Sequence, residues 1–211
     1  PGRCSATHGK KLKMEPFLHL DAVALPIPRS NVDTDQIVPA RYLQKPRSDD
    51  FGQFLFRDLR FDKQGHEVSS FILNQPPYRQ ARVVVAQSNF GCGSSREHAV
   101  WALHDYGFRA VIAPSFGDIF FSNALKNGLL PIVLPPEATA MLLEKVQAVP
   151  GTRIVIDLPS QTVTAADGSI HAFQIDAFSK KCLIEGLNEI DYTLQNADHI
   201  TAFERQYAAN I

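Results

Sequence analysis

The sequence predicts an α/β fold, in which one domain has a mostly parallel core sheet covered by helices. Short apolar runs at 82–86, 110–113 and 130–134 alternate with helical patterns at 95–106 and 116–126. Strands and helices that alternate in this way form right-handed crossovers, which place successive strands parallel in one sheet. In addition, 211 residues with 45% apolar composition are enough to build one well-packed core.

The first half of the chain contains one predicted strand and then a long irregular stretch. Residues 17–27 alternate loosely in polarity and end at two prolines, which predicts a strand. Residues 30–39 are dense in side chains that bond their own backbone in turns and caps. From about 42 to 80 the periodicity is poor and prolines and glycines interrupt it. We expect an extended excursion there, helical in part around 51–59, that forms a mobile loop.

The second half is regular, and its turns carry clear signals. Gly107 is suited to the left-handed cap that ends the helix at 95–106. Asp167-Gly168 predicts a hairpin turn, which adds an antiparallel edge to the sheet. The predicted order is completed by a helix at 137–148, strands at 153–158, 162–165 and 169–173, and helices at 176–187 and about 197–207.

Composition excludes several classes of protein. The formal net charge of −1 gives no reason to expect binding to nucleic acid or to an anionic membrane. No apolar run approaches the roughly 20 residues that span a bilayer. Residues 1–13 are basic and lack an apolar centre, so they do not resemble a signal peptide. We expect them to be a tag or disordered tail before a natural start at Met14, followed by a single domain over 14–211.

The cysteines indicate a reducing compartment. Cys4, Cys92 and Cys182 are odd in number and far apart, which suits neither a disulfide framework nor a zinc ribbon. We therefore expect a cytoplasmic protein. With Cys4 in the tail, two thiols remain, too few for the four-cysteine ligation usual of iron–sulfur clusters. This chain is expected to hold no metal or cofactor by itself.

The most informative stretch is the glycine-lined turn that follows the strand at 82–86. It runs through Gly91, Cys92 and Gly93 into Ser94, Ser95, Arg96 and Glu97. Ser94 with Glu97 fits a capping box, which marks the start of a helix. The N-terminus of a helix presents free N–H groups and the positive end of the helix dipole, both of which attract anions. The positive charge of Arg96 is unfavourable at the positive end of the helix dipole, unless a bound carboxylate pairs with its guanidinium. The turn therefore predicts a site for an anionic ligand beside a serine.

Simpler interpretations accompany each of these residues. Ser94 and Ser95 could be helix caps only. Cys92 sits near a helix N-terminus, which lowers a thiol pKa, but no histidine-plus-acid set accompanies it, so a small buried thiol is favoured over a nucleophile. His98 and His104 are expected to be packing or solvated histidines. Asp35 is a candidate partner for either Arg41 or Arg96.

Three segments together resemble the small subunit of 3-isopropylmalate dehydratase, a family of the aconitase superfamily. The match extends from about Met14 to the last helix, and its Gly-Ser-Ser-Arg-Glu-His motif is highly specific. The 51–61 stretch resembles the long bacterial form. The three segments are Asn31 to Pro39, Asn89 to Ala99, and Ala113 to Phe120 with Asn127 to Pro131.

The resemblance implies a swivelling β/β/α domain that forms half of an active site. The large-subunit partner would carry a [4Fe–4S] cluster, and the pair would interconvert 2- and 3-isopropylmalate through isopropylmaleate in leucine biosynthesis. By position, Ser94 would be the base, Arg96 would hold a carboxylate of the dicarboxylic acid substrate, and Asp35 would belong to the hydrogen-bonded surroundings. The remaining expected substrate-binding residues are Ser95, Thr34, Arg41, Leu43 and Lys45.

The resemblance implies that substrate choice depends on the segment after Tyr42. It resembles the family's specificity loop, and Leu43 suits an isopropyl group. Gln44 stands where short-form relatives have arginine, which weakens a homoaconitase interpretation, although Lys45 could substitute. Related diacids (methylmalate, citraconate, homoaconitate) therefore remain alternatives. A stand-alone anion-binding module and a hydrolase using Cys92 or Ser94 are the alternatives from other classes.

Overall fold

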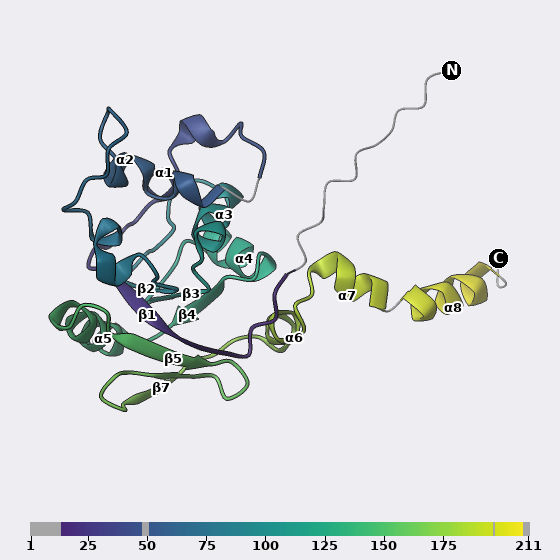
Figure 1. The fold of residues 1–211 in the computed structure, drawn as a ribbon. Coiled ribbons are helices and arrows are strands. Elements are labelled where there is room, and N and C mark those ends of the chain that lie inside the picture. The colour runs from purple at the N-terminus through teal and green to yellow at the C-terminus, as the bar shows by residue number, and fades with distance from the viewer. Residues whose placement is uncertain (1–13, 48–50, 196, 209–211) are drawn as a thin grey trace, which may run out of the picture.

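A mixed sheet runs through the molecule in the order β4-β3-β2-β1-β5-β6-β7 (Figure 1). The computed structural model describes residues 14–47, 51–195 and 197–208, so the expected tail at 1–13 lies outside it. The strands are β1 (His19–Ile27), β2 (Val83–Ala86), β3 (Ala110–Ala113), β4 (Leu130–Val133), β5 (Arg153–Asp157), β6 (Thr162–Thr164) and β7 (Ile170–Ala172).

Strand β1 divides the sheet into a parallel and an antiparallel half. On one side β1, β2, β3 and β4 are parallel, with Ala24 opposite Val83 and Val83 opposite Ala110. On the other side β5, β6 and β7 follow antiparallel, with Leu20 opposite Ile156. Gly168 takes a positive φ of 83° in the tight β6–β7 turn. The parallel core and the antiparallel edge confirm the prediction from sequence.

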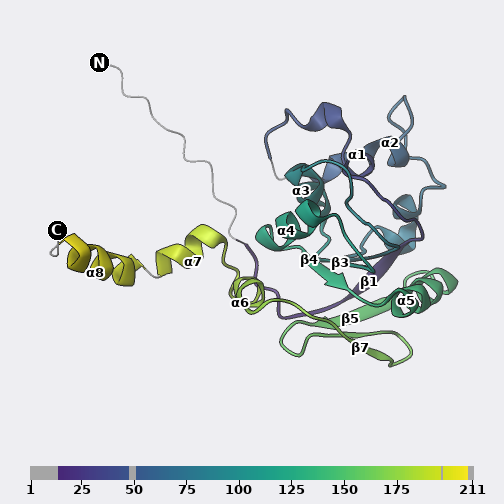
Figure 2. The ribbon, with the colours of Figure 1, turned by 180° about the vertical axis from the view of Figure 1, so that it is seen from behind.

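Helices cover both faces of the sheet (Figures 1 and 2). Strands β2 and β3 are buried along their whole length, as parallel strands between two helical layers must be. Val84 and Val111 contribute to the core under α3, α4 and the excursion, whereas Val85 and Ile112 contribute to the core under α5. The helices are α1 (Thr34–Ile37), α2 (Arg57–Arg60), α3 (Glu97–Tyr106), α4 (Asp118–Lys126), α5 (Pro136–Ala148), α6 (Ala177–Glu185), α7 (Glu189–Gln195) and α8 (Ala197–Ala208).

The excursion between β1 and β2 is built from short helical turns packed on α3. Phe51, Leu55 and Leu73 are fully buried in the core that it shares with α3. These side chains anchor the described part of the excursion, while the mobility expected from the sequence stays a prediction. The turns other than α1 and α2 are the 3₁₀ helices Ala40–Tyr42, Phe51–Phe54, Ile72–Asn74 and Pro76–Tyr78.

Helices α7 and α8 extend away from the sheet at the C-terminal end (Figures 1 and 2). Sequence patterns predicted α8, at 197–207, but not α7, whose seven residues are too few for a helical period to stand out. Among the described helices none is both long and apolar enough to cross a bilayer.

Candidate active site

Three loops meet at the carboxyl edge of the parallel strands. The loop after β1 and the loop after β2 are joined by backbone hydrogen bonds, from Gly91 N–H to the Val32 carbonyl (2.7 Å) and from Thr34 N–H to the Cys92 carbonyl (2.9 Å). The loop after β3 joins from the other side, where Phe90 N–H donates to the Ser115 carbonyl (3.1 Å). Ligands of open α/β sheets bind at this edge, so the topology itself assembles a site here.

Gly91 permits this close approach. Its φ is +73°, and a Cβ atom built on it would lie 2.2 Å from Cγ of Phe120, on helix α4. No residue with a side chain fits that space. The turn therefore packs against α4 on one side and leaves Gly93, Ser94 and Ser95 exposed on the other.

Ser94 and Ser95 are both exposed. Within the described part of the chain, neither hydroxyl has a hydrogen-bond partner. The backbone around them is held instead, because the Ser94 carbonyl accepts from Thr34 Oγ1 (3.3 Å) and from Arg96 N–H (2.8 Å). Buried Thr34 thus supports the serine turn, and its predicted role toward substrate stays a prediction.

The capping box predicted from Ser94 and Glu97 is wrong. Helix α3 begins at Glu97 and its N-cap is Arg96, whose side chain makes no capping hydrogen bond. The Glu97 carboxylate is drawn away by Asn127, whose Nδ2 donates to Glu97 Oε1 at 2.7 Å. Ala99 N–H donates to the Arg96 carbonyl (3.3 Å), while the N–H groups of Glu97 and His98 have no partner among the described residues and stay available to an anion. The other end of the helix is as predicted, with Gly107 in the left-handed cap.

Arg96 is held by Asp35. The guanidinium and the carboxylate form an ion pair across 61 positions of sequence, the Arg96 side chain being 21% exposed and that of Asp35 53% exposed. Asp33 stabilises the helix that carries Asp35, because Asp33 Oδ1 caps α1 by accepting from Gln36 N–H at 2.8 Å. Of the two candidate partners for Asp35, the structure selects Arg96.

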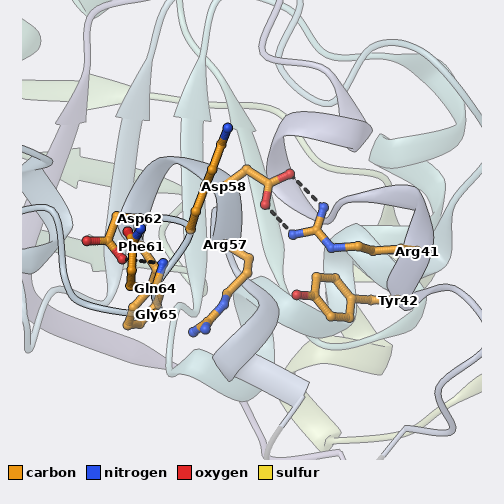
Figure 3. A pocket seen from close by; sticks show the side chains of 9 residues that line it. Arg41, Tyr42, Arg57, Asp58, Phe61, Asp62, Gln64 and Gly65 are labelled. Carbon is orange, nitrogen blue, oxygen red and sulfur yellow. Dashed lines mark hydrogen bonds and ion pairs between the residues drawn. The ribbon is translucent and has the colours of Figure 1, made fainter.

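Arg41 pairs with Asp58 instead. Two hydrogen bonds join the groups, one of them 2.8 Å from Nη1 to Oδ2, and they hold the pKa of Asp58 below its usual range. The pair borders a cavity of about 620 Å³ that Tyr42 and Arg57 also line (Figure 3). Neither Leu43 nor Lys45 lines this cavity, and a role of these three residues toward substrate stays a prediction.

Cys92 is poorly suited to nucleophilic attack. Partial burial and then the nearby Asp33 carboxylate raise the pKa of its thiol, which disfavours the reactive thiolate. Its place beside the serine turn is therefore that of a packing thiol, in agreement with the interpretation from sequence. His98 likewise packs, with its ring 4.5 Å from that of Trp101 and 5.8 Å from that of Phe51.

The donor set of an iron–sulfur cluster is not assembled in the described residues. They contain no group of three or more histidine, cysteine, aspartate or glutamate side chains placed to hold a metal ion. Cys92 lies in the serine turn and Cys182 in α6. The described residues do not fit a cluster.

Sequence reasoning missed two sets of residues at this edge. Asn31 and Asn89 both adopt positive φ, and Asn89 Nδ2 donates to Asn31 Oδ1 (2.8 Å), which ties the two loops together. Asparagine is the usual non-glycine residue in this conformation, so its presence in both loops was the available signal. Arg47, which bonds Asp105 in the last turn of α3, and Asn127, which bonds Glu97 in its first turn, had no local signal because their partners are distant in sequence.

The chain is similar to known proteins over most of its length. The family model described as the aconitase C-terminal domain matches residues 14–137, LeuD_N matches 140–177, and the C-terminal domain of the 3-isopropylmalate dehydratase small subunit matches 189–210. A 3-isopropylmalate dehydratase small subunit from Cereibacter sphaeroides (strain KD131) is 48% identical over 195 residues, covering 92% of this chain and 97% of the relative. One from Paramagnetospirillum magneticum is 49% identical over 191 residues, covering 90% and 95%.

A solved structure supports the fold as well. The crystal structure of 3-isopropylmalate dehydratase from Methanocaldococcus jannaschii superimposes with a TM-score of 0.64 at 26% sequence identity. The alignment covers 89% of this chain and 99% of that one. With curated relatives at nearly half identity over almost their whole length, the chain belongs to the family of 3-isopropylmalate dehydratase small subunits, within the aconitase C-terminal-domain fold.

Proposed function

We propose that this chain supplies the base and the carboxylate clamp of a hydro-lyase that interconverts 2-isopropylmalate and 3-isopropylmalate through dehydration and rehydration. The observation that carries the proposal is the exposed Ser94 hydroxyl, which has no partner among the described residues, beside an arginine that Asp35 holds in place. An enzyme of this class takes a proton from the carbon next to a carboxylate and removes hydroxide from the neighbouring carbon.

Ser94 is the group we assign to the proton transfer. A serine hydroxyl is a weak base in water, so its alkoxide needs positive groups nearby and exclusion of solvent. The uncapped first turn of α3 and the Arg96 guanidinium supply the positive groups. Solvent exclusion has to come from elsewhere, because the serine turn is exposed in this chain alone. A second protein surface that covers the turn would provide it.

Arg96 is the group we assign to substrate binding. Its planar guanidinium pairs with a carboxylate through two parallel hydrogen bonds, which fixes the substrate's orientation as well as its position. Asp35 holds one edge of that guanidinium before substrate arrives. The substrate carboxylate then meets a cation that has already lost part of its conformational freedom, which lowers the entropic cost of binding.

The partner that we propose is the large subunit, with the chain acting in the cytoplasm. A [4Fe–4S] cluster held there would act as the Lewis acid for the departing hydroxyl, since the described residues of this chain do not assemble a ligand set. The isopropyl side chain would face the segment at Leu43. A reconstituted complex assayed anaerobically on isopropylmalate, methylmalate and homoaconitate tests the substrate, and a much higher rate on another diacid would overturn it.

Replacing Ser94 tests the assignment of the base. Ser94→Ala should lower kcat of the complex by about a thousandfold or more, because the proton acceptor is removed while Arg96 still binds substrate. The exposed hydroxyl bonds to no described residue, so the melting temperature and co-purification with the partner should not change. Near-normal turnover of the variant would remove Ser94 from the mechanism.

A further inference from the structure

Arg47 is the centre of a hydrogen-bonded network between the loop after the first 3₁₀ helix and helix α3. Its Nη2 and Nε bind both carboxylate oxygens of Asp105 at 2.8 and 3.2 Å, and its Nη1 donates to Asn127 Oδ1 at 3.0 Å. The Arg47 side chain is 22% exposed and the Asp105 side chain 8% exposed. A planar fork that serves two acceptors at once has its position fixed by both.

Asn127 carries the network on to the start of α3. Its amide is saturated, because Oδ1 accepts from Arg47 and from Trp101 Nε1 (3.1 Å). Its Nδ2 donates to the Asn123 carbonyl (2.9 Å) and to Glu97 Oε1 (2.7 Å). An amide with all four bonding positions filled has one orientation available. Glu97 is the first residue of α3 and follows Arg96 directly in the chain.

The same network holds one end of the segment 43–46. The other end is held by Tyr42, whose ring stacks on Phe54 with centroids 4.3 Å apart. Between the two ends, Lys45 N–H donates to the Tyr42 carbonyl at 3.0 Å. The segment that carries Leu43 is therefore clamped at Tyr42 and at Arg47, and it is Arg47 that connects it to the helix that follows the arginine clamp.

A stability role alone does not account for this arrangement. Burying an ion pair costs desolvation that its attraction only partly offsets, and apolar residues of similar volume would hold α3 as well. What a fully bonded network adds is a single conformation. Here that conformation fixes the end of the segment 43–46 directly against Asp105, in the last turn of α3. Through Asn127 it also fixes this segment relative to Glu97, in the first turn.

We propose that Arg47 is a positioning residue for recognition of the substrate's alkyl substituent. It sets the distance between the segment at Leu43 and the Arg96 end of α3, and so the size of the substituent that fits between them. This inference rests on the proposed function, because it assigns that segment to the side chain of the diacid and Arg96 to its carboxylate.

The test is Arg47→Lys in the reconstituted complex. Lysine keeps the charge near Asp105 but cannot bond Asp105 and Asn127 in the same fork. We expect KM for 2-isopropylmalate to rise about tenfold with kcat changed less than about threefold, because positioning and not proton transfer is affected. The preference for isopropylmalate over methylmalate, as a ratio of kcat/KM, should fall about tenfold.

Arg109→Lys is the matched control. Arg109 is also largely buried, at 7% exposure, and bonds Glu15 Oε2 (2.9 Å) and the Glu15 carbonyl (2.9 Å). It directly precedes β3, at the end of the parallel strands opposite to the serine turn. The control should lower thermal stability without changing KM or the preference among diacids. An equal loss of preference in both variants would overturn the proposal, as would an unchanged KM and preference in Arg47→Lys.

Hydrogen–deuterium exchange of the full chain tests, independently of substrate identity, whether Arg47 holds the segment in place. Arg47→Lys should speed amide exchange over 42–47 by about fivefold and leave exchange in β3 unchanged, since only the loop is released. Equal exchange over 42–47 in the variant and the wild type would overturn the role of Arg47. Absence of turnover of every diacid by the wild-type complex would instead reject the proposed function, and the exchange result would still stand.

Discussion

At the residue scale, the ion pair of Arg96 and Asp35 orients a side chain of the proposed site while adding little to the free energy of folding. The Asp35 side chain is exposed, and ion pairs with an exposed partner contribute between about 0 and 1 kcal/mol to the free energy of folding. Asp35 therefore acts mainly on the orientation of the guanidinium. An arginine at the start of a helix opposes the macrodipole, and the nearby carboxylate offsets that cost before substrate binds.

Arg96→Lys tests the carboxylate clamp. Lysine keeps the charge but loses the planar fork, so KM for the diacid should rise about tenfold or more, with a smaller change in kcat. Arg153→Lys is the control, because Arg153 also pairs with an aspartate, Asp21 (Nε to Oδ1, 2.8 Å), on the β1–β5 side of the sheet. Steady-state kinetics of the two complexes would contradict the assignment if KM moved equally in both or in neither.

Asp105 should make stability depend on pH. Burial alone would raise its pKa, but hydrogen bonds from His104 and Arg47 with the Arg47 charge outweigh burial, so the native pKa lies below the ordinary value. The unfolded carboxyl titrates near about 4, so the native state favours the ionised form. This stabilisation is present above about pH 4 and is lost as the pH falls through the native pKa.

Asp105→Asn measures that contribution. The variant should be about 2 kcal/mol less stable at pH 7, because Arg47 loses a charged acceptor. The difference from wild type should shrink as the pH falls from about 5 to about 3, because the unfolded carboxyl takes up a proton there that the native carboxylate resists. Urea unfolding at the three pH values checks the sign, and a difference that widens in acid would contradict it.

At the element scale, the turn between β2 and α3 depends on Gly91 for two separate reasons. The residue needs a positive φ, and a Cβ added to it would clash with the ring of Phe120 on α4. Gly91→Ala should therefore cost roughly 3 kcal/mol, from backbone strain plus overpacking, and should displace the serine turn.

Gly168 separates the two contributions. Its φ of +83° resembles that of Gly91, but a Cβ there would meet nothing within 4 Å. Gly168→Ala should cost only about 1 kcal/mol, from strain alone. Denaturant midpoints of the two variants should differ accordingly, and equal losses would mean that contact with Phe120 contributes nothing.

Periodicity was a good guide to elements and a poor guide to their ends. Strand β3 lies where the apolar run predicted it, because a short buried strand between two helices is specified by its own residues. The start of α3 was misplaced because the capping box is a local rule, whereas Glu97 has a stronger partner in Asn127, 30 positions away. Tertiary contacts override a local cap when they satisfy the same side chain.

At the scale of the whole molecule, the proposed site lies at an open edge of the sheet. The three loops bring Ser94 and Arg96 to the surface at one edge of the sheet, where water still reaches the serine. A serine that must act as a base has to be covered. The shape of the chain thus agrees with an enzyme that functions only when a partner protein covers this edge.

The isolated chain should therefore show no turnover of isopropylmalate, and addition of the large subunit should restore it. If the partner holds the proposed cluster, oxygen or an iron chelator should abolish turnover of the complex, while the melting temperature of this chain stays the same. Anaerobic assays with thermal unfolding of each protein measure both effects. Full activity of the metal-free chain alone would refute the proposed division of labour.

The sequence by itself determined the α/β class, the parallel core, the hairpin and the glycine-lined serine turn, because each is encoded by residues close together in the chain. Only the tertiary structure decided that Asp35 pairs with Arg96 and Arg41 with Asp58. It alone revealed Arg47, whose partners lie 58 and 80 positions away. Periodicity and turn chemistry act over a few residues, whereas charged side chains choose among several partners that only the folded backbone brings within reach.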